Sequence, residues 1–437
     1  MTASLGEKIK ALRKEQKMTQ AALAGNEMTK SMLSQIENNM AMPSMKNLQY
    51  LASRLGKPAS FFLDGGDYSK NLPMDDIQKE LKEADTLYRN GGFRDAADRL
   101  KQIGEKYNFD HDSKLYADYL ARYGEVLIDL NRIEEATALI EEAASIYEGK
   151  YLYIDAAKTY LLLSGRSWNL FQYETCLEIL DQGKRIYEKA MNRDYAFEIE
   201  LLFNRSIYMA SLDRIEESIK ATEEALEISK QTRIYYRTDE LLKNMAVLNT
   251  LRGRYDHFDY YLEKASRFAE AVDNNLVLPS IDLVRAKYHN DTGNPREAMA
   301  HLNKTISAAN PFVLPLFHAE YAKSYYLLEE YEKALEHTGQ IKYPDYVPSK
   351  HDYIYIWSSK TTEGLCYLKV GRVQEALTAL HEGIERLELI GVSACLSDAY
   401  KAAGEVYSDI GNYEEAYSVL KKSTEIYDTV KTKGLYY

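Results

Sequence analysis

The stretch GEVYSDIGNYEEA, residues 404–416, decides the fold because its pattern recurs along most of the chain. A small residue, Gly404, comes first, a Gly-Asn turn follows, and Tyr413 comes directly after the turn. We call the residue at that last position the hook. Nine hooks occur at intervals of 36 to 42 residues, and a fixed period in this range is typical of a repeat array. They are Phe93, Ile133, Tyr173, Ile215, Tyr255, Pro295, Tyr331, Val373 and Tyr413.

Residue size follows the same period. The residue nine positions before every hook is small, and the residue three positions after it is small in eight of the nine repeats. Two antiparallel helices can approach closely only where the facing positions lack bulk. An apolar residue seven positions after the hook, replaced only by Thr222 and Thr338, would fill that seam. The sequence therefore predicts nine units of helix, turn and helix, stacked on one another in an all-α solenoid.

Charge is unevenly distributed along the 437 residues. The net charge is −12, but residues 1–65 hold nine Lys or Arg against five Asp or Glu, which gives +4 there and −16 in the remainder. A basic head on an acidic body indicates that only the head binds nucleic acid.

The sequence carries no motif of catalysis or metal binding. HExxH, GxSxG and phosphate-binding glycine loops are missing, and the eight histidines lack ligand spacing. The three cysteines form no CxxC pair and leave an odd count, which fits a reducing compartment. Neither a secretory apolar region nor a run of 18 apolar residues is present. We therefore expect a cytoplasmic protein that is not an enzyme and has no cofactor, metal or membrane partner.

Residues 1–65 break the period and have a pattern of their own. Thr19 and Thr29 can cap two short helices, TQAALA and TKSMLSQIE, and Pro43-Ser44 can start another. A first helix containing Leu5 and Leu12 and a last one ending near Phe61 complete a set of five. This layout, with a turn between the second and third helices, is that of a helix-turn-helix DNA-binding domain.

This segment resembles the lambda-repressor-like, XRE-type helix-turn-helix family. The residues that match are Leu12-Arg13-Lys14, Thr19-Gln20, Ser31, Leu33-Ser34-Gln35-Ile36-Glu37 and Pro43-Ser44. The resemblance implies that the third helix enters the major groove and that Arg13 and Glu37 form an internal ion pair. The connection between the second and third helices is one residue shorter than the family's usual pattern.

Candidate DNA contacts follow from positions on these helices. The exposed face of the third helix should meet base edges, where Gln35 can read adenine and Met32 can touch a thymine methyl. Helix starts can hold phosphates, and lysines add salt-dependent affinity. The alternative for each side chain is ordinary solvation. The candidate set is Gln20, Thr29, Lys30, Ser31, Met32, Gln35, Ser44 and Lys46.

Residues 66–75 lie in a stretch rich in Gly, Pro, Asp and Asn, which indicates a flexible linker. Residues 76–437 resemble the tetratricopeptide repeat family through turn, hook and small residue, as in Gly411-Asn412-Tyr413 with Ala416. The period near 40 exceeds that family's usual 34 residues, so longer helices are expected. Packing should differ after Tyr255, because Phe258 stands where a small residue belongs.

The repeat resemblance implies a right-handed superhelix whose first helices line a concave groove. Positions eleven and eight before each hook then face that groove. Asn204 and Asn244 share one such position in adjacent repeats and can clamp the backbone of an extended peptide, while Lys287 and Lys323 can hold a chain terminus. The alternative is that these side chains brace neighbouring helices or are only solvated. The candidate peptide contacts are Arg122, Asn204, Asn244, Lys287, Asn290 and Lys323.

The combination of an XRE-type domain and such an array resembles the RRNPP family of peptide-pheromone receptors, and most closely its NprR-like members. The resemblance implies a cytoplasmic transcription regulator that binds a short signalling peptide in the groove. It also implies a homodimer, or a tetramer, on a double-stranded DNA operator. Two alternatives stay open: a protein-sequestering scaffold that binds a phosphorelay response regulator, and a constitutive repressor whose repeats only dimerise.

Overall fold

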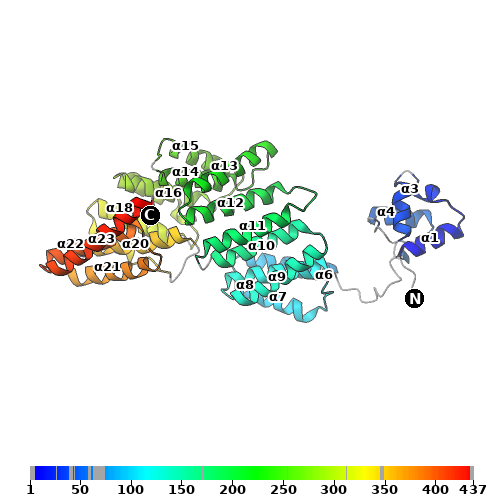
Figure 1. The fold of residues 1–437 in the computed structure, drawn as a ribbon, viewed down its shortest axis with the longest axis horizontal. Coiled ribbons are helices and arrows are strands. Elements are labelled where there is room, and N and C mark those ends of the chain that lie inside the picture. The colour runs from blue at the N-terminus through cyan, green and yellow to red at the C-terminus, as the bar shows by residue number, and fades with distance from the viewer. Residues whose placement is uncertain are drawn as a thin grey trace. The chain divides into compact units, whose positions relative to one another are not determined.

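The computed structural model of the chain is all-α, as the sequence predicts, with no strand among the residues it describes (Figure 1). None of its described helices is long and apolar enough to cross a membrane. The chain forms two compact units, Met1–Asp110 and His111–Tyr437, while the domain limits expected at residues 65 and 76 stay a prediction. The structure describes residues 5–25, 27–38, 43, 45–57, 61–62, 74–168, 171–252, 254–311, 313–344 and 349–433.

Four short helices of the helix-turn-helix domain have described bounds. Thr19 Oγ1 accepts a hydrogen bond from the Ala22 N–H at 3.0 Å, and Thr29 Oγ1 accepts one from the Met32 N–H at 3.1 Å. Both threonines are therefore the N-caps that the sequence predicts. The fifth helix and the linker fall largely outside the described residues. The four helices are α1 Leu5–Glu15, α2 Gln20–Ala24, α3 Lys30–Glu37 and α4 Met45–Arg54.

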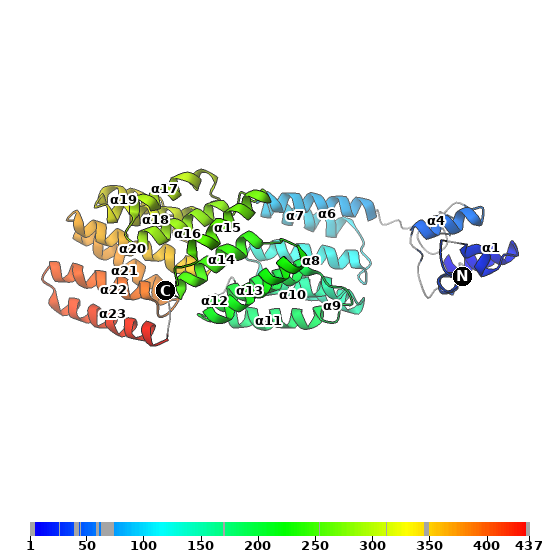
Figure 2. The same cartoon turned by 90° about the horizontal axis from the view of Figure 1, so that it is seen from above.

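Nine helical hairpins follow along the described part of the chain. Figures 1 and 2 show that the two helices of a hairpin, such as α8 and α9, run side by side. In the unit His111–Tyr437 each hairpin also packs against the next, as α9 does against α10. The pairs are α6 Met74–Arg89 with α7 Phe93–Lys106, α8 Lys114–Asp129 with α9 Ile133–Gly149, α10 Tyr153–Trp168 with α11 Tyr173–Tyr187, α12 Tyr195–Ser211 with α13 Ile215–Thr232, α14 Thr238–Leu251 with α15 Phe258–Ala271, α16 Leu278–Asp291 with α17 Pro295–Thr305, α18 Leu314–Leu327 with α19 Tyr331–Thr338, α20 Lys350–Lys369 with α21 Val373–Glu388, and α22 Ala394–Asp409 with α23 Tyr413–Lys433.

The hooks mark where second helices begin. Eight of the nine hooks are the first residue of a second helix. The exception is Tyr255, which is 50% exposed, and α15 begins instead at Phe258. Phe258 is 2% exposed, and its ring centre lies 4.4 Å from that of Tyr288. The different packing expected in this repeat is therefore confirmed.

Small residues open the seam between the two helices of a hairpin. A Cβ atom added to Gly124 would lie 2.3 Å from Ile140 Cγ1, and one added to Gly364 would lie 2.5 Å from Leu380 Cγ. Ile140 and Leu380 are the apolar residues seven positions after their hooks. The predicted seam is thus confirmed, and any larger side chain at these glycines would meet an occupied position.

One group of contacts joins repeats that are far apart in the chain. The backbone N–H of Lys350 donates to the hydroxyl of Tyr173 at 2.9 Å, and Lys350 Nζ lies 3.4 Å from Asp213 Oδ2. The ring centres of Phe171 and Tyr353 lie 5.7 Å apart. We call these five residues the clasp. It connects the start of α20 with the start of α11 and the turn after α12, whereas solenoid repeats ordinarily contact only their neighbours.

Candidate functional site

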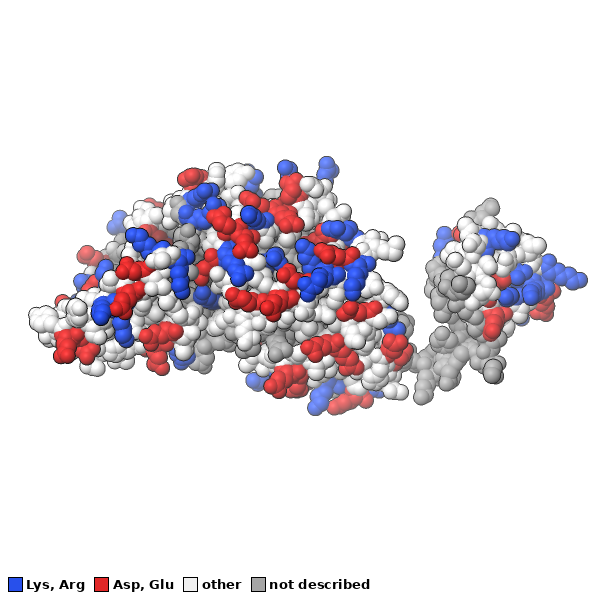
Figure 3. All heavy atoms as spheres, in the orientation of Figure 1, with Lys and Arg blue, Asp and Glu red and all other residues white. Residues whose placement is uncertain are grey.

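Helix α3 has the exposed face that a DNA-reading helix needs. Leu33, Ile36 and Glu37 are buried, which turns the opposite side outward. Figure 3 shows Lys and Arg gathered on the visible face of this domain, whereas both signs of charge are mixed over the visible face of the larger unit. A helix with an exposed polar face on a domain with a basic surface can enter the major groove. On its outward side Lys30, Ser31 and Gln35 are exposed and Met32 is half-buried.

A buried ion pair fixes the position of α3 against α1. Arg13 donates to both oxygens of Glu37, from Nε at 2.5 Å and from Nη2 at 2.9 Å, and Gln20 Nε2 donates to Glu37 Oε2 at 2.9 Å. Burial acts to raise the pKa of Glu37, but the hydrogen bonds from Arg13 and Gln20 outweigh it and hold the pKa below its ordinary value. The predicted ion pair is confirmed, and the side chain of Gln20 is engaged in its network.

The remaining DNA candidates have simpler surroundings. Thr29 caps α3 through its hydroxyl. Lys46 is exposed, and its Nζ lies 3.3 Å from Glu27 Oε2. Ser44 lies outside the described residues. DNA contact by any of these side chains stays a prediction.

A cavity of about 420 Å³ lies on the first helices of the last four repeats. All of its lining residues belong to α16, α18, α20 and α22, so no second helix contributes to it. Lys287 and Lys323 both line it, as do Thr362 and Ala402, which lie eleven positions before their hooks. These four residues hold positions expected to face the groove, whereas Val284 and Glu320, which also lie eleven positions before their hooks, do not line the cavity.

Asp291 connects the two lysines of the cavity. Lys323 Nζ lies 2.5 Å from Asp291 Oδ1, and Lys287 Nζ lies 3.7 Å from Asp291 Oδ2. Lys287 Nζ also lies 4.0 Å from the centre of the Tyr355 ring, which is a cation–π contact. The cavity thus presents two ammonium groups that share one carboxylate.

A buried polar network lies close to the two lysines. Asn290 Nδ2 donates to Glu320 Oε2 at 2.7 Å, and Ser324 Oγ donates to Asn290 Oδ1 at 2.9 Å. Burial raises the pKa of Glu320, while Lys287 and Lys323 act in the opposite direction. Asn290, a candidate peptide contact, is only 3% exposed. Its geometry favours the bracing alternative, because its amide joins α16 to α18.

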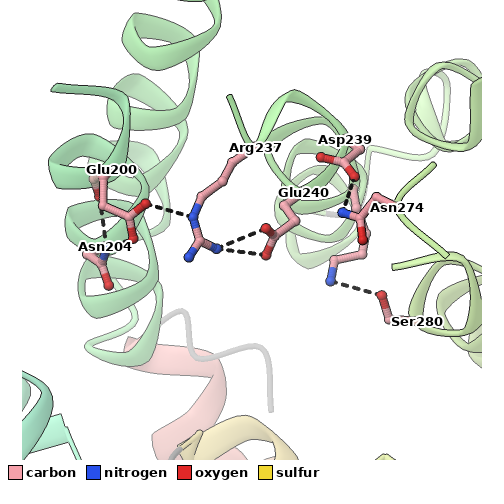
Figure 4. Close-up of polar contacts among 8 residues, drawn as sticks. Glu200, Asn204, Arg237, Asp239, Glu240, Asn274 and Ser280 are labelled. Carbon is pink, nitrogen blue, oxygen red and sulfur yellow. Dashed lines mark hydrogen bonds and ion pairs between the residues drawn. The ribbon is translucent and has the colours of Figure 1, made fainter. Parts of the chain in front are cut away.

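A second polar row lies on α12, on Arg237 just before α14, and on the start of α14, as Figure 4 shows. Arg237 sits between Glu200 and Glu240, with Nε 2.8 Å from Glu200 Oε2 and Nη1 2.9 Å from Glu240 Oε1. Asn204 Nδ2 donates to the backbone oxygen of Glu200 at 2.9 Å and to its Oε1 at 3.2 Å. Asn204 is half-buried and so remains a candidate contact for a ligand beside the Glu200–Arg237 pair.

Asn244 has a different environment although it shares the register of Asn204. It is 9% exposed, and its Nδ2 donates to Ser206 Oγ at 2.8 Å and to Thr222 Oγ1 at 3.3 Å. The two amides therefore do not form a matched pair in the groove, and Asn244 braces the α12–α13 seam. Arg122 is half-buried on α8, interacts electrostatically with Tyr147, and does not line the cavity.

The cavity also contains residues that the sequence analysis did not single out. Tyr355 and Cys395 lie 18 positions before their hooks, and Ser358 and Asp398 lie 15 positions before theirs. Steps of three or four residues return to the same face of a helix. Extending the groove-facing positions by two further turns toward the start of each first helix would have found them. Asp291 lies four positions after Lys287, one turn further toward the end of α16, and the same step would have found it.

Comparisons with known proteins agree with this two-part organisation. Residues 9–62 match the helix-turn-helix family, and residues 397–429 match the tetratricopeptide repeat family. No curated protein sequence matches the chain. The chain is similar in structure to the apo form of the quorum sensor NprR from B. thuringiensis, with 14% identity and a TM-score of 0.51 over 80% of this chain and 99% of that one.

Two further solved structures are similar to the chain. Aspartyl phosphate phosphatase F from Bacillus subtilis has 17% identity and a TM-score of 0.49 over 80% of this chain and 93% of that one. Bacillus thuringiensis PlcR in complex with the peptide PapR7 and DNA has 17% identity and a TM-score of 0.43 over 62% of this chain and 96% of that one.

The chain therefore combines a helix-turn-helix domain with a solenoid of tetratricopeptide-like repeats. The quorum sensor NprR shares this fold, so the resemblance drawn from the sequence is confirmed at the level of the fold.

Proposed function

We propose that the chain is a transcription regulator that binds operator DNA through α3 and responds to a short peptide bound in the cavity of its last four repeats. The observation that carries this proposal is the presence, in one chain, of a capped helix with an exposed polar face and a polar cavity on the first helices of the repeats. The fold shared with a quorum sensor supports it. The regulator would act in the cytoplasm as a homodimer on paired half-sites.

The position of the cavity suggests how a peptide affects the rest of the array. Its lining comes from four consecutive repeats, so one ligand contacts α16, α18, α20 and α22 together. A ligand that binds one spacing of these helices better than another shifts the population toward that spacing. Small rotations between repeats then add along the solenoid and change the geometry available to the DNA-binding heads.

The DNA-binding part is tested by selecting sites for the full-length protein from random duplex DNA at a stated salt concentration. Gln35→Ala should weaken binding to the selected site by about 1–3 kcal/mol and relax the preference at one base pair. Lys30→Ala should weaken binding to all sequences alike and lower the salt slope by about 1. Gln49→Ala, an exposed glutamine on α4, is the matched control and should change neither property.

The peptide-binding part is tested by adding pools of random heptapeptides to the protein bound to its selected site. A change in DNA affinity or in the size of the complex supports the proposal. A protein that binds peptide without either change would be a repressor whose repeats do not regulate it. Absence of site-specific DNA binding in the wild type would instead favour the alternative of a protein-sequestering scaffold.

A further inference from the structure

The two lysines of the cavity are arranged to bind a carboxylate. We infer that the cavity takes a free carboxylate of the ligand on Lys287 and Lys323, and that Asp291 occupies this place until the ligand replaces it. This inference rests on the proposed function, because it specifies the chemistry of the same peptide site.

The geometry of Asp291 is that of a bound carboxylate. Its two oxygens face different ammonium groups, with Oδ1 2.5 Å from Lys323 Nζ and Oδ2 3.7 Å from Lys287 Nζ. The side chain of Asp291 is 46% exposed, so it lies at the open side of the cavity and can move into solvent. A ligand carboxylate has the same shape and charge and can accept the same charge-assisted hydrogen bonds.

The lysines are held in place by more than Asp291. Lys287 Nζ lies over the Tyr355 ring, 4.0 Å from its centre, and this contact does not depend on Asp291. Lys323 belongs to α18. The next residue, Ser324, donates a hydrogen bond to Asn290 of α16. The two helices that carry the lysines are therefore joined at this point, and the distance between the ammonium groups is restrained before a ligand arrives.

The charges around the two lysines favour an anion at the position that Asp291 occupies. Glu320 is completely buried, and its Oε1 has no hydrogen-bond partner among the described residues. Burial raises its pKa, so this carboxyl resists ionisation more than an exposed one. Asp291 is the carboxylate paired with both ammonium groups, while Asp398, Lys401 and Glu405 also line the cavity. A ligand carboxylate that replaces Asp291 keeps the charge at this point balanced, whereas a cation placed there would face two ammonium groups.

The carboxylate can come from the C-terminus of the peptide or from an Asp or Glu side chain. Three pools of random heptapeptides separate these sources: free acids without Asp or Glu, the same sequences as carboxamides, and carboxamides that include Asp and Glu. Full-length protein is incubated with each pool, and the retained peptides are identified by mass spectrometry.

Occupancy of the cavity is followed through Cys395. This half-buried thiol lines the cavity, whereas Cys176 and Cys366 are fully buried. Because burial raises the pKa of the Cys395 thiol, alkylation is measured at alkaline pH. A bound peptide should slow alkylation of Cys395.

Free acids should be retained about tenfold or more over the matching carboxamides. Lys287→Met and Lys323→Met should lower free-acid binding to the carboxamide level. Asp291→Asn should tighten free-acid binding several-fold and leave carboxamide binding unchanged. The controls are Lys304→Met, an exposed lysine paired with Asp282 at 3.4 Å, and Asp259→Asn, an exposed aspartate 3.5 Å from Arg285.

Preferential retention of the carboxamides that contain Asp or Glu would support the carboxylate and place it on a side chain. Equal retention of free acids and plain carboxamides would overturn the inference while leaving peptide binding intact. Unchanged free-acid affinity in Asp291→Asn would also overturn it. If no pool is retained at all, it is the proposed peptide-binding function that fails.

Discussion

The helix-turn-helix domain and the repeat array are held together in different ways. In the domain, the buried pair Arg13–Glu37 joins α1 to α3, and Gln20 brings α2 into the same network. In the array, one kind of seam is repeated, with a small residue such as Gly364 facing an apolar one such as Leu380. The domain depends on a specific charge, whereas the array depends on residue size at a fixed period. Damage should therefore spread through the domain but stay local in the array.

The largest expected effect breaks the domain. Arg13→Ala leaves Glu37 buried without its cation, and removal of one partner from a buried ion pair costs about 3–5 kcal/mol. That is a large share of the stability of a small domain. We expect loss of site-specific DNA binding and of the domain's unfolding transition, with the transition of the array unchanged. Calorimetry of the full-length protein and a DNA-binding assay measure both.

Acid should also weaken this ion pair in the wild-type domain. Because the pKa of Glu37 is lowered in the folded protein, its stabilising contribution is present at neutral pH and is lost as pH falls through that lowered pKa. Lys46→Ala is the control, since it breaks an exposed pair with Glu27 that contributes about 0–1 kcal/mol. If the domain of Arg13→Ala unfolds in the same calorimetric transition as the wild type, the ion pair does not hold the domain together.

The next effect concerns the seam of the array. Gly364→Ala places a Cβ atom 2.5 Å from Leu380 Cγ, and such overpacking costs about 1–3 kcal/mol. Gly165→Ala, on helix α10, meets no atom within 4 Å and should gain about 0.5–1 kcal/mol of helix stability. Denaturant unfolding gives the free energies, and hydrogen exchange should show that the loss is confined to α20, α21 and their neighbours. Equal changes in the free energy of unfolding would contradict the requirement for a small residue in the seam.

A smaller effect concerns a histidine pair between α18 and α19. His318 Nδ1 and His337 Nδ1 lie 3.1 Å apart. Burial, with His318 adding to it, lowers the pKa of His337 to about 4 from an ordinary 6.5. As pH falls from about 6.5 to about 4, the unfolded chain takes up a proton that the folded one does not, so stability falls across that window.

His337→Gln should reduce this acid loss of stability, and His381→Gln, an exposed histidine on α21, should not. Unfolding of the full-length protein across that pH range measures the difference. An unchanged pH profile in His337→Gln would assign the acid sensitivity of the array to other groups.

The smallest effect on stability, but not on shape, is expected at the clasp. Lys350 and Asp213 are both partly exposed, so Lys350→Ala should cost no more than about 1 kcal/mol. The array should nevertheless become more extended, and small-angle scattering would detect a larger radius of gyration. Lys421→Ala removes a pair within α23 and should leave the radius unchanged. An unchanged radius in both variants would show that the Lys350–Asp213 pair does not restrain the superhelix.

Features of the fold that depend on neighbouring residues could be predicted from the sequence. The hooks located eight second-helix starts, and Thr19 and Thr29 marked two N-caps, because each depends on residues within about a turn. The clasp between Lys350 and Asp213 could not be predicted. It depends on rotations that accumulate over several repeats between residues 137 positions apart.

The candidate site was predictable to a similar extent. Lys287 and Lys323 were identified from their register and line one cavity. Asn204 and Asn244 hold the same position in their repeats but have different surroundings. Thr222 stands where the seam usually has an apolar residue, and its hydroxyl accepts a hydrogen bond from the Asn244 side-chain amide. That exception was visible in the sequence, but its meaning required the position of Ser206 across the seam.

The contact between Lys350 and Asp213 closes a covalent stretch of 137 residues into a loop. A solenoid without such a contact can lengthen by small, equal changes at every repeat. This one cannot lengthen between its two closing points without first opening there. Stretching the molecule from its ends should therefore open this contact first, in one step, and only afterwards extend the repeats between residues 213 and 350 one by one.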